Sequence, residues 1–387
     1  MDFTTSDEHR MLRETAAKIA AGFGHDYYVQ QSREGGDAAE LWQAMADAGF
    51  VGANTPEAYG GSGLGLQELA IMGEEMAAAG CPSPMSVISP AIVASVLVRH
   101  GSHEQKSTFL PRMASGDTNV VFAVTEPDAG SNTHVLTTTA APDGEEYVLR
   151  GAKYYISGVN TASAILVVAR TSVEEDTGRG RLSLFLVDTD SVGLQAVPIP
   201  MEMTAPEKQF TVTFDDVRVP ADRLVGEEGR GLQAVFDGLN PERVMGAAMS
   251  LGIARYALDK AVRYAKERSV WGAPIGTHQG IAHPLARVRI ALDQAELLVR
   301  KAAWMYDNGA DAAAAGAAAT MAKFAAAEVA EQALDRAIQT HGGNGLATEY
   351  GLATLWGITR IWRIAPISEE MTLNHVAQSV LGLPRSF

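Results

Sequence analysis

Four segments decide the fold of this chain: EYVLRGAKYYISG (residues 146–158), ASAILVVART (162–171), RLSLFLVDTD (181–190) and QFTVTFDDVRVP (209–220). Each is short, rich in β-branched and aromatic residues, and bounded by Gly, Pro or Asp, which is typical of β-strands. No helical stretch separates them. The pattern therefore predicts an antiparallel β-barrel or sandwich and disfavours the alternating β and α units of a nucleotide-binding sheet.

Helical periodicity lies on both sides of these strands. Segments such as LRETAAKIAAGF (12–23) and LQELAIMGEEMAAAG (66–80) place apolar residues three to four positions apart. The same period returns in long segments such as ERVMGAAMSLGIARYALDKAVRYAKERS (242–269), whose length favours a helical bundle. We therefore predict an α+β chain with a helical domain over 1–120, a β domain over 121–225 and a helical bundle over 226–387.

Composition excludes several classes of protein. The 387 residues are 47% hydrophobic and 20% charged, a globular balance that excludes wholesale disorder. A net charge of −15, without clustered Lys and Arg, argues against nucleic acid as a partner. Because Cys81 is the single cysteine, no intrachain disulfide forms, and we expect a reducing, cytoplasmic location. Neither a signal peptide nor a membrane span is expected, and the nine histidines lack metal-ligand spacing.

Three loops have compositions that suit a ligand. TEPDAGSN (125–132) leaves backbone N–H groups free for a polar ring or a phosphate, although an ordinary surface turn has the same composition. RSVWG (268–272) places an arginine at a helix end, where it binds a phosphate or balances the helix dipole. QTHGGNG (339–345) has more glycines than a helix C-cap requires. No G-x-G-x-x-G or Walker motif occurs, so a Rossmann enzyme is not expected.

Two acidic positions are candidates for acid–base chemistry. Glu242 begins the first long C-terminal helical segment, and Glu369 precedes the last one. Acidic residues in a first helical turn are also favoured by the helix dipole, so both positions admit a purely structural explanation.

In their order along the chain, these motifs resemble the acyl-CoA dehydrogenase family. TEPDAGSN is similar to the family's T-E-P-x-A-G-S-D signature, KYYIS (153–157) to K-x-W-I-T, and FDDVRVP (214–220) to F-x-x-V-x-V-P. PEAYGG (56–61), Arg268 with Gly272 and Gln279, and the Q-x-x-G-G run from Gln339 complete the resemblance, which covers almost the whole chain. It implies a helical domain, a middle β-barrel, a C-terminal four-helix bundle, FAD as cofactor, and a homotetramer or dimer.

The resemblance also implies roles for individual residues. The flavin ring would be contacted by Phe122, Val124, Thr125, Tyr155, Ile156 and Ser157. The adenosine and pyrophosphate of FAD would be bound across a subunit interface by Arg268, Trp271, Gln279, Gln339, Gly342 and Gly343. The CoA part of the substrate would be contacted by Ser131, Asn240 and Arg243. No metal is implied.

The implied reaction removes a proton from Cα and a hydride from Cβ of an acyl-CoA thioester. A carboxylate takes the proton while hydrogen bonds stabilise the developing enolate, and flavin N5 takes the hydride. Most relatives carry the base at the motif where Glu369 aligns, whereas one branch carries it at the position of Glu242. Because Asn240-Pro241-Glu242-Arg243 resembles that branch, Glu242 is favoured as the base and Glu369 is the alternate.

Two other functions stay open. One is a flavin oxidase or monooxygenase of the same fold, and the other is a non-catalytic scaffold that binds FAD or CoA. For the favoured function, the resemblance implies fatty acid and lipid metabolism and an electron-transfer flavoprotein, or a similar acceptor, as partner. Acyl chain length, branching and pathway are not indicated by the residues.

Overall fold

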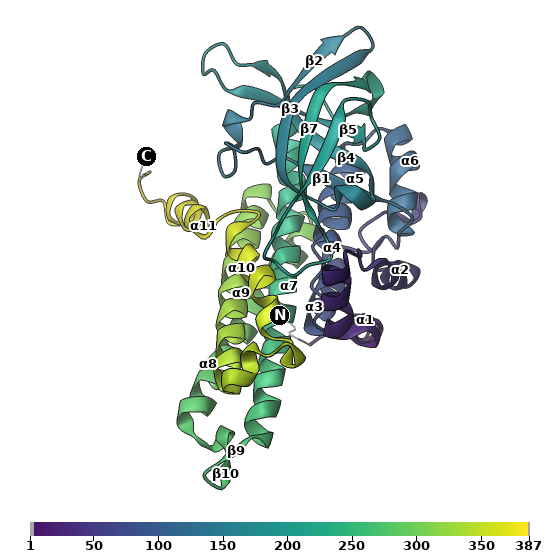
Figure 1. The fold of residues 1–387 in the computed structure, drawn as a ribbon. Helices are drawn as coiled ribbons and strands as arrows, with labels where there is room; N and C mark the ends of the chain where they lie inside the picture. Colours follow the sequence, from purple (N-terminus) through teal and green to yellow (C-terminus); the bar gives the residue numbers. More distant parts are fainter. Residues whose placement is uncertain (1–3, 386–387) are drawn as a thin grey trace.

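A computed structural model describes residues 4–385, and its helical regions lie before and after a β region (Figure 1). The predicted order of helical, β and helical regions is confirmed. The N-terminal helices are α1 (Asp7–Glu34), α2 (Ala39–Asp47), α3 (Leu66–Ala78), α4 (Met85–Val87), α5 (Ser95–His100) and α6 (His103–Ala114). A π-helical segment, Ile88–Ala94, connects α4 to α5.

Helix α3 connects the N-terminal region to the C-terminal bundle. Its first turn is capped by Asp307, whose carboxylate accepts hydrogen bonds from the N–H groups of Leu66 (2.8 Å) and Gln67 (3.0 Å). An acidic cap satisfies free N–H groups and complements the helix dipole. Buried residues of α3, including Leu69 and Met72, belong to the same hydrophobic core as the bundle. The two helical regions therefore pack as one body.

The β region contains eight paired strands. They are β1 (Asn119–Ala123), β2 (Thr139–Asp143), β3 (Glu146–Ser157), β4 (Ala162–Val173), β5 (Gly180–Asp188), β6 (Leu194–Ile199), β7 (Gln209–Pro220) and β8 (Leu224–Val225). Hydrogen bonding follows the order β6-β7-β3-β2-β4-β5-β8, and β1 pairs with β4. Because this path runs from β6 to β8 without a pairing that joins its ends, the predicted closed barrel is not shown among the described residues.

Strand direction also differs from the prediction. Most neighbours are antiparallel, but β1 and β2 both run parallel to β4. Strand β4 reaches these partners after the β2–β3 hairpin has turned the chain, so the pairing joins strands that are distant in sequence. A period-two pattern identifies a strand without specifying its neighbour or direction. The antiparallel arrangement expected from the sequence therefore holds for most strand pairs but not for the pairing of β1 and β2 with β4.

The C-terminal bundle contains three long helices and shorter ones. They are α7 (Gly231–Glu267), α8 (Gln279–Asp307), α9 (Ala312–His341), α10 (Trp356–Ile364) and α11 (Glu369–His375). A small hairpin of β9 (Ser269–Val270) and β10 (Ala273–Pro274) joins α7 to α8 at the end of the bundle away from the sheet (Figure 1). Helix α9 buries many alanines against its neighbours, and these small side chains permit close helix approach.

Two structural features are absent from residues 4–385. None of the helices there is long and apolar enough to cross a membrane. Within the same range, no group of three or more His, Cys, Asp and Glu side chains is arranged to hold a metal ion.

Candidate active site

A cavity of about 1660 Å³ lies between the β region and the helical regions. One small-molecule site usually occupies about 300 to 1,000 Å³, so this cavity has room for more than one such group. Ten of the residues predicted as site residues line it: Phe122, Val124, Thr125, Ser131, Tyr155, Ile156, Ser157, Asn240, Glu242 and Arg243. Residues from distant parts of the sequence therefore meet at one site.

The wall formed by β3 contains a β-bulge. Pairing with β7 shifts register between Lys153 and Ile156, and Tyr155 has a left-handed φ of 58°. Bulges re-aim side chains, and a bulky residue in this conformation is strained. The bulge leaves Tyr155 half exposed at the cavity, whereas Ile156 is buried and Ser157 is partly buried.

A buried ion pair holds the loop that follows β1. The Lys153 ammonium donates to Glu126 Oε1 (2.9 Å) and to the carbonyl oxygen of Val124 (3.0 Å), and the Tyr154 N–H donates to the carbonyl oxygen of Thr125 (2.8 Å). Burial opposes ionisation of Glu126, but the Lys153 charge and hydrogen bonds outweigh it and lower its pKa to about 2. The carbonyls of Val124 and Thr125 thus have partners within the protein.

Glu242 lies on the cavity wall in α7. Pro241 removes the N–H that would bond the carbonyl oxygen of Asp237, and the Tyr306 hydroxyl donates to that oxygen instead (3.4 Å). Burial raises the pKa of Glu242 to about 7, although the charges of Arg243 and Lys323 act in the opposite direction. At neutral pH this carboxyl can therefore both accept and release a proton.

Asp237 is the other carboxylate among the described residues that line the cavity. It pairs with Arg99 (Nη1–Oδ1, 3.0 Å) and with His100 (Nε2–Oδ2, 2.7 Å). Both of its carboxylate oxygens therefore already have partners within the protein. Glu242 is therefore the cavity carboxylate better suited to accept a proton.

The structure places Glu369 in a different environment. It is not among the lining residues, and its carboxylate is ion-paired with Arg363 (Nε–Oε2, 2.8 Å), which also binds Glu331. The neighbouring Pro366, Ile367 and Ser368 do line the cavity but have no carboxyl group. Glu369 and Glu242 therefore do not share the cavity.

The predicted CoA contacts Asn240 and Arg243 form a pair on α7, in which Arg243 Nη1 donates to Asn240 Oδ1 (2.7 Å). Arg243 is buried, and its Nε has no hydrogen-bond partner among the described residues. A buried donor without a partner is costly, so this guanidinium is suited to an anionic or carbonyl ligand. Ser131 lines the same cavity from the loop after β1 and is exposed.

Six predicted cofactor residues lie at the opposite end of the bundle. They are exposed and do not line the cavity: Arg268, Trp271, Gln279, Gln339, Gly342 and Gly343. The two sequence regions meet there because the Tyr264 ring stacks on His341 at a centroid distance of 4.2 Å. Glu242 and Arg268 are 26 positions apart, and α7 spans nearly all of them, so at 1.5 Å per residue the two backbones are separated by roughly 39 Å.

Three family models match this chain. They are described as the N-terminal, middle and C-terminal domains of acyl-CoA dehydrogenase and match residues 6–117, 121–217 and 229–381. The chain belongs to the acyl-CoA dehydrogenase family. The predicted resemblance is confirmed, and with it the family's enzyme class, an oxidoreductase.

Individual proteins of known sequence or structure agree with this family. Acyl-CoA dehydrogenase FadE12 of Mycobacterium tuberculosis is 50% identical over 385 residues, which cover 100% of this acyl-CoA dehydrogenase and 99% of FadE12. The solved butyryl-CoA dehydrogenase from Megasphaera elsdenii has a TM-score of 0.91 and 26% identity, covering 98% and 100% of the two chains. A solved FAD complex of PigA has a TM-score of 0.91 and 27% identity, covering 99% and 100%.

Sequence reasoning missed several cavity residues of this acyl-CoA dehydrogenase. Gln209 begins β7 and hydrogen-bonds through its side-chain amide to the Ser157 hydroxyl (2.8 Å). Trp362 of α10 also lines the cavity. Lys323 of α9 does not line it, but it donates to the carbonyl oxygen of Ile367 (2.6 Å), a residue that does. Gln209 is recognisable in the sequence only as the start of a strand, and Trp362 and Lys323 stand in none of the motifs, so no signal in the sequence marks them as site residues.

Proposed function

We propose that this chain is an FAD-dependent acyl-CoA dehydrogenase in which Glu242 removes the α-proton of an acyl-CoA thioester. One observation carries the proposal: Glu242 is a cavity carboxyl whose pKa is raised to about 7. A thioester α-proton is a very weak acid, so a base with a raised pKa is better matched to it than a solvated carboxylate. The ion pair of Glu369 with Arg363, outside the cavity lining, supports Glu242 over Glu369.

The residues around the cavity fit a flavin ring. Phe122, Tyr155 and Ile156 supply apolar or aromatic surface, and Ser157 supplies a hydroxyl. The internal hydrogen bonds of the Val124 and Thr125 carbonyls mean that this loop would present donors to a ligand. FAD, when bound, supplies the acceptor for the hydride that leaves Cβ of the substrate. Lys153 and Glu126 would hold the loop in place during that transfer.

Arg243 and Asn240 would orient the substrate. The Nε of Arg243 has no acceptor among residues 4–385, so we assign it to the CoA part of the thioester together with Ser131. Holding the thioester beside Glu242 makes proton removal effectively intramolecular. Binding of the substrate would displace water from the cavity, which strengthens these polar contacts.

A second copy of the chain would complete the FAD site. The Arg268–Gly343 cluster, defined as Arg268, Trp271, Gln279, Gln339, Gly342 and Gly343, lies roughly 39 Å along α7 from Glu242, which exceeds the span of one FAD molecule. We therefore infer that this cluster binds the adenosine and pyrophosphate of FAD held by a partner subunit. A dimer satisfies this geometry, and a homotetramer contains two such pairs.

The electron acceptor is the feature that separates this function from its main alternative. A dehydrogenase passes electrons to an electron-transfer flavoprotein or a similar acceptor, whereas an oxidase of the same fold consumes oxygen. Mixing the reduced protein with air in the absence of any acceptor distinguishes them. We expect oxygen to reoxidise the flavin slowly, with peroxide forming only at that slow rate, whereas an oxidase would form peroxide rapidly.

The function is tested by anaerobic bleaching of the FAD absorbance with short, medium, long and branched acyl-CoAs. We expect at least one of them to bleach the wild type. The rate of bleaching in E242Q should be lower by a factor of at least about a thousand, although the variant retains FAD and binds acyl-CoA. E369Q is the matched control and should bleach at close to the wild-type rate. Loss of bleaching in E369Q with retention in E242Q would assign the base to Glu369.

A further inference from the structure

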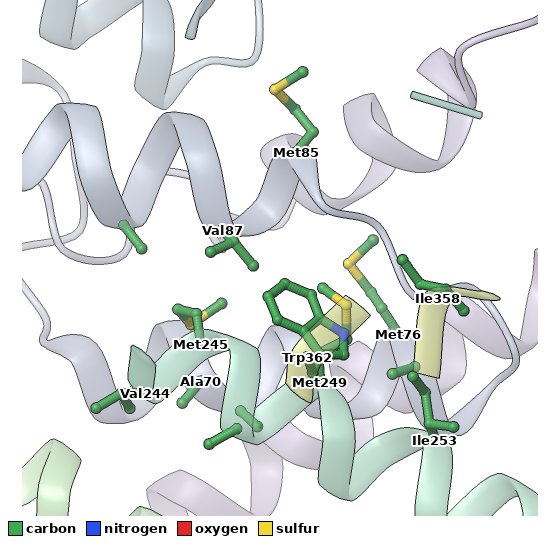
Figure 2. Close-up of a cluster of buried hydrophobic side chains, with 14 of the residues drawn as sticks. Ala70, Met76, Met85, Val87, Val244, Met245, Met249, Ile253, Ile358 and Trp362 are labelled. Carbon is green, nitrogen blue, oxygen red and sulfur yellow. The ribbon is translucent and has the colours of Figure 1, made fainter. Parts of the chain in front are cut away.

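Trp362 lies where the active-site cavity meets the hydrophobic core. It projects from α10, is 4% exposed, and lines the cavity. Figure 2 shows its indole ring among side chains that include Val87, Met245 and Met249. Because a large flat ring fills this position, it separates the cavity from the core behind it.

Gly246 allows the Trp362 ring to lie directly against α7. A Cβ atom at Gly246 would be 2.7 Å from Cε3 and 2.8 Å from Cζ3 of Trp362, closer than real contacts occur. Glu242 and Gly246 are four residues apart on α7, so they share one face of the helix. The indole ring therefore lies about one helical turn from the base.

The cavity lining ends at Trp362. Val87, Ile88 and Ile92 also line the cavity and supply apolar walls. Several side chains near the indole ring in Figure 2 are almost fully buried and do not line the cavity: Met76, Met245, Met249, Ile253 and Ile358. On this side Trp362 thus separates the cavity from a core rich in methionine.

We propose that Trp362 forms the floor of the acyl-binding end of the cavity and limits this enzyme to short or compact acyl groups. The proposal rests on the function proposed above, since it places the acyl chain beyond the carbon that Glu242 attacks. An acyl chain whose Cα lies at Glu242 can extend by about the length of one helical turn before it reaches the indole ring. Longer chains must displace a packed indole, which costs binding energy.

Acyl-CoAs of different chain length, reacted with the holoenzyme, test whether Trp362 is this floor. We expect wild-type kcat/KM for flavin reduction to fall from butanoyl-CoA through octanoyl-CoA to dodecanoyl-CoA. In W362L the ratio of dodecanoyl-CoA to butanoyl-CoA should rise by about tenfold or more, because the opened floor admits additional methylenes. W362F removes less volume and should show a smaller rise in the same ratio. It also supplies the measurement if W362L folds poorly.

W42L is the matched control. Trp42 is a buried tryptophan of α2 that does not line the cavity, so its loss should lower stability without changing the chain-length ratio. Wild-type preference for dodecanoyl-CoA, or an unchanged ratio in both folded Trp362 variants, would overturn the floor assignment and leave the proposed reaction intact. If no acyl-CoA bleaches the flavin, the proposed reaction fails, and acyl-CoA Kd values across the same series and variants still decide for or against the floor.

Discussion

Glu126 and Glu242 show how local surroundings give the same residue type opposite properties. Glu126 has Lys153 and the N–H groups of Thr137 and Thr138 as partners, and these outweigh the penalty of burial so that its pKa falls to about 2. Glu242 has no such set of donors within the described part of the chain, and burial raises its pKa to about 7. A fixed carboxylate serves to hold a loop, whereas a poised carboxyl serves as a base.

The pKa of Glu242 predicts how the reaction depends on pH. The carboxyl must be ionised to take a proton, so the rate of flavin reduction should fall about tenfold per pH unit below pH 7. Stopped-flow measurement of bleaching between pH 5 and pH 9 checks this expectation. A rate that stays constant down to pH 5 would show that the base has an ordinary carboxyl pKa.

The same pKa has a consequence for stability. Folding raises the pKa of Glu242 above its usual 4.5. The side chain therefore contributes to the free energy of unfolding at pH values below 4.5, and this contribution is lost as the pH rises through about 7. E242Q cannot ionise, so at pH 8 its free energy of unfolding should exceed that of the wild type. Urea unfolding of both proteins at pH 8 and pH 5 measures this difference, which should shrink at the lower pH.

At the scale of elements, α7 connects the site to the rest of the molecule. It carries Asn240, Glu242 and Arg243 near one end, and it packs along α3 through Gly252. A Cβ at Gly252 would lie 2.2 Å from the carbonyl oxygen of Glu74 and 2.6 Å from Cβ of Ala77. The position of the base therefore depends on a close contact between two helices.

G252A should force α3 and α7 apart. Overpacking of this kind costs roughly 1 to 3 kcal/mol or more of unfolding free energy, measured by urea titration. G22A is the control, because Gly22 is an exposed position in α1 with no atom within 4 Å of an added Cβ. There the substitution should raise the free energy of unfolding by about 0.5 to 1 kcal/mol, because alanine has a higher helix propensity than glycine. Equal changes in the free energy of unfolding for G252A and G22A would show that close packing of α3 against α7 at Gly252 does not determine stability.

At the scale of the whole molecule, the predicted FAD residues separate into two groups at opposite ends of the subunit. One group surrounds the cavity, and the other is the exposed Arg268–Gly343 cluster beside the β9–β10 hairpin (Figure 1). Trp271 in this cluster is 90% exposed, which is unusual for a tryptophan without a partner surface. The separation is the basis for placing two subunits around each FAD.

Complementation between inactive variants tests this arrangement. E242Q removes the base, and R268A removes the cationic contact of the Arg268–Gly343 cluster. In a hybrid oligomer, one site combines Glu242 of the R268A subunit with Arg268 of the E242Q subunit, so co-expression should restore flavin bleaching that neither variant shows alone. Hybrid formation is verified by two affinity tags. If verified hybrids do not recover bleaching, Glu242 of one subunit and Arg268 of the other do not act at the same FAD site.

The sequence by itself determined the class of every region and the family. Hydrophobic residues repeat every two positions along a strand and every three to four along a helix, because one face of the element is buried. These repeats identified the β region and the helices on either side. Short motifs such as TEPDAGSN and KYYIS identified the acyl-CoA dehydrogenase family for the same reason, since the loops they form are built from neighbouring residues.

Tertiary structure alone decided strand direction, the open sheet path and the composition of the cavity. Pairing of β1 with β4 and packing of Trp362 on Gly246 join residues far apart in sequence, and no local pattern specifies such contacts. The distinct surroundings of Glu242 and Glu369 arise in the same way. A pKa is set by burial and by charges that approach through space, so the sequence could name two glutamates but only the fold places one of them in the cavity.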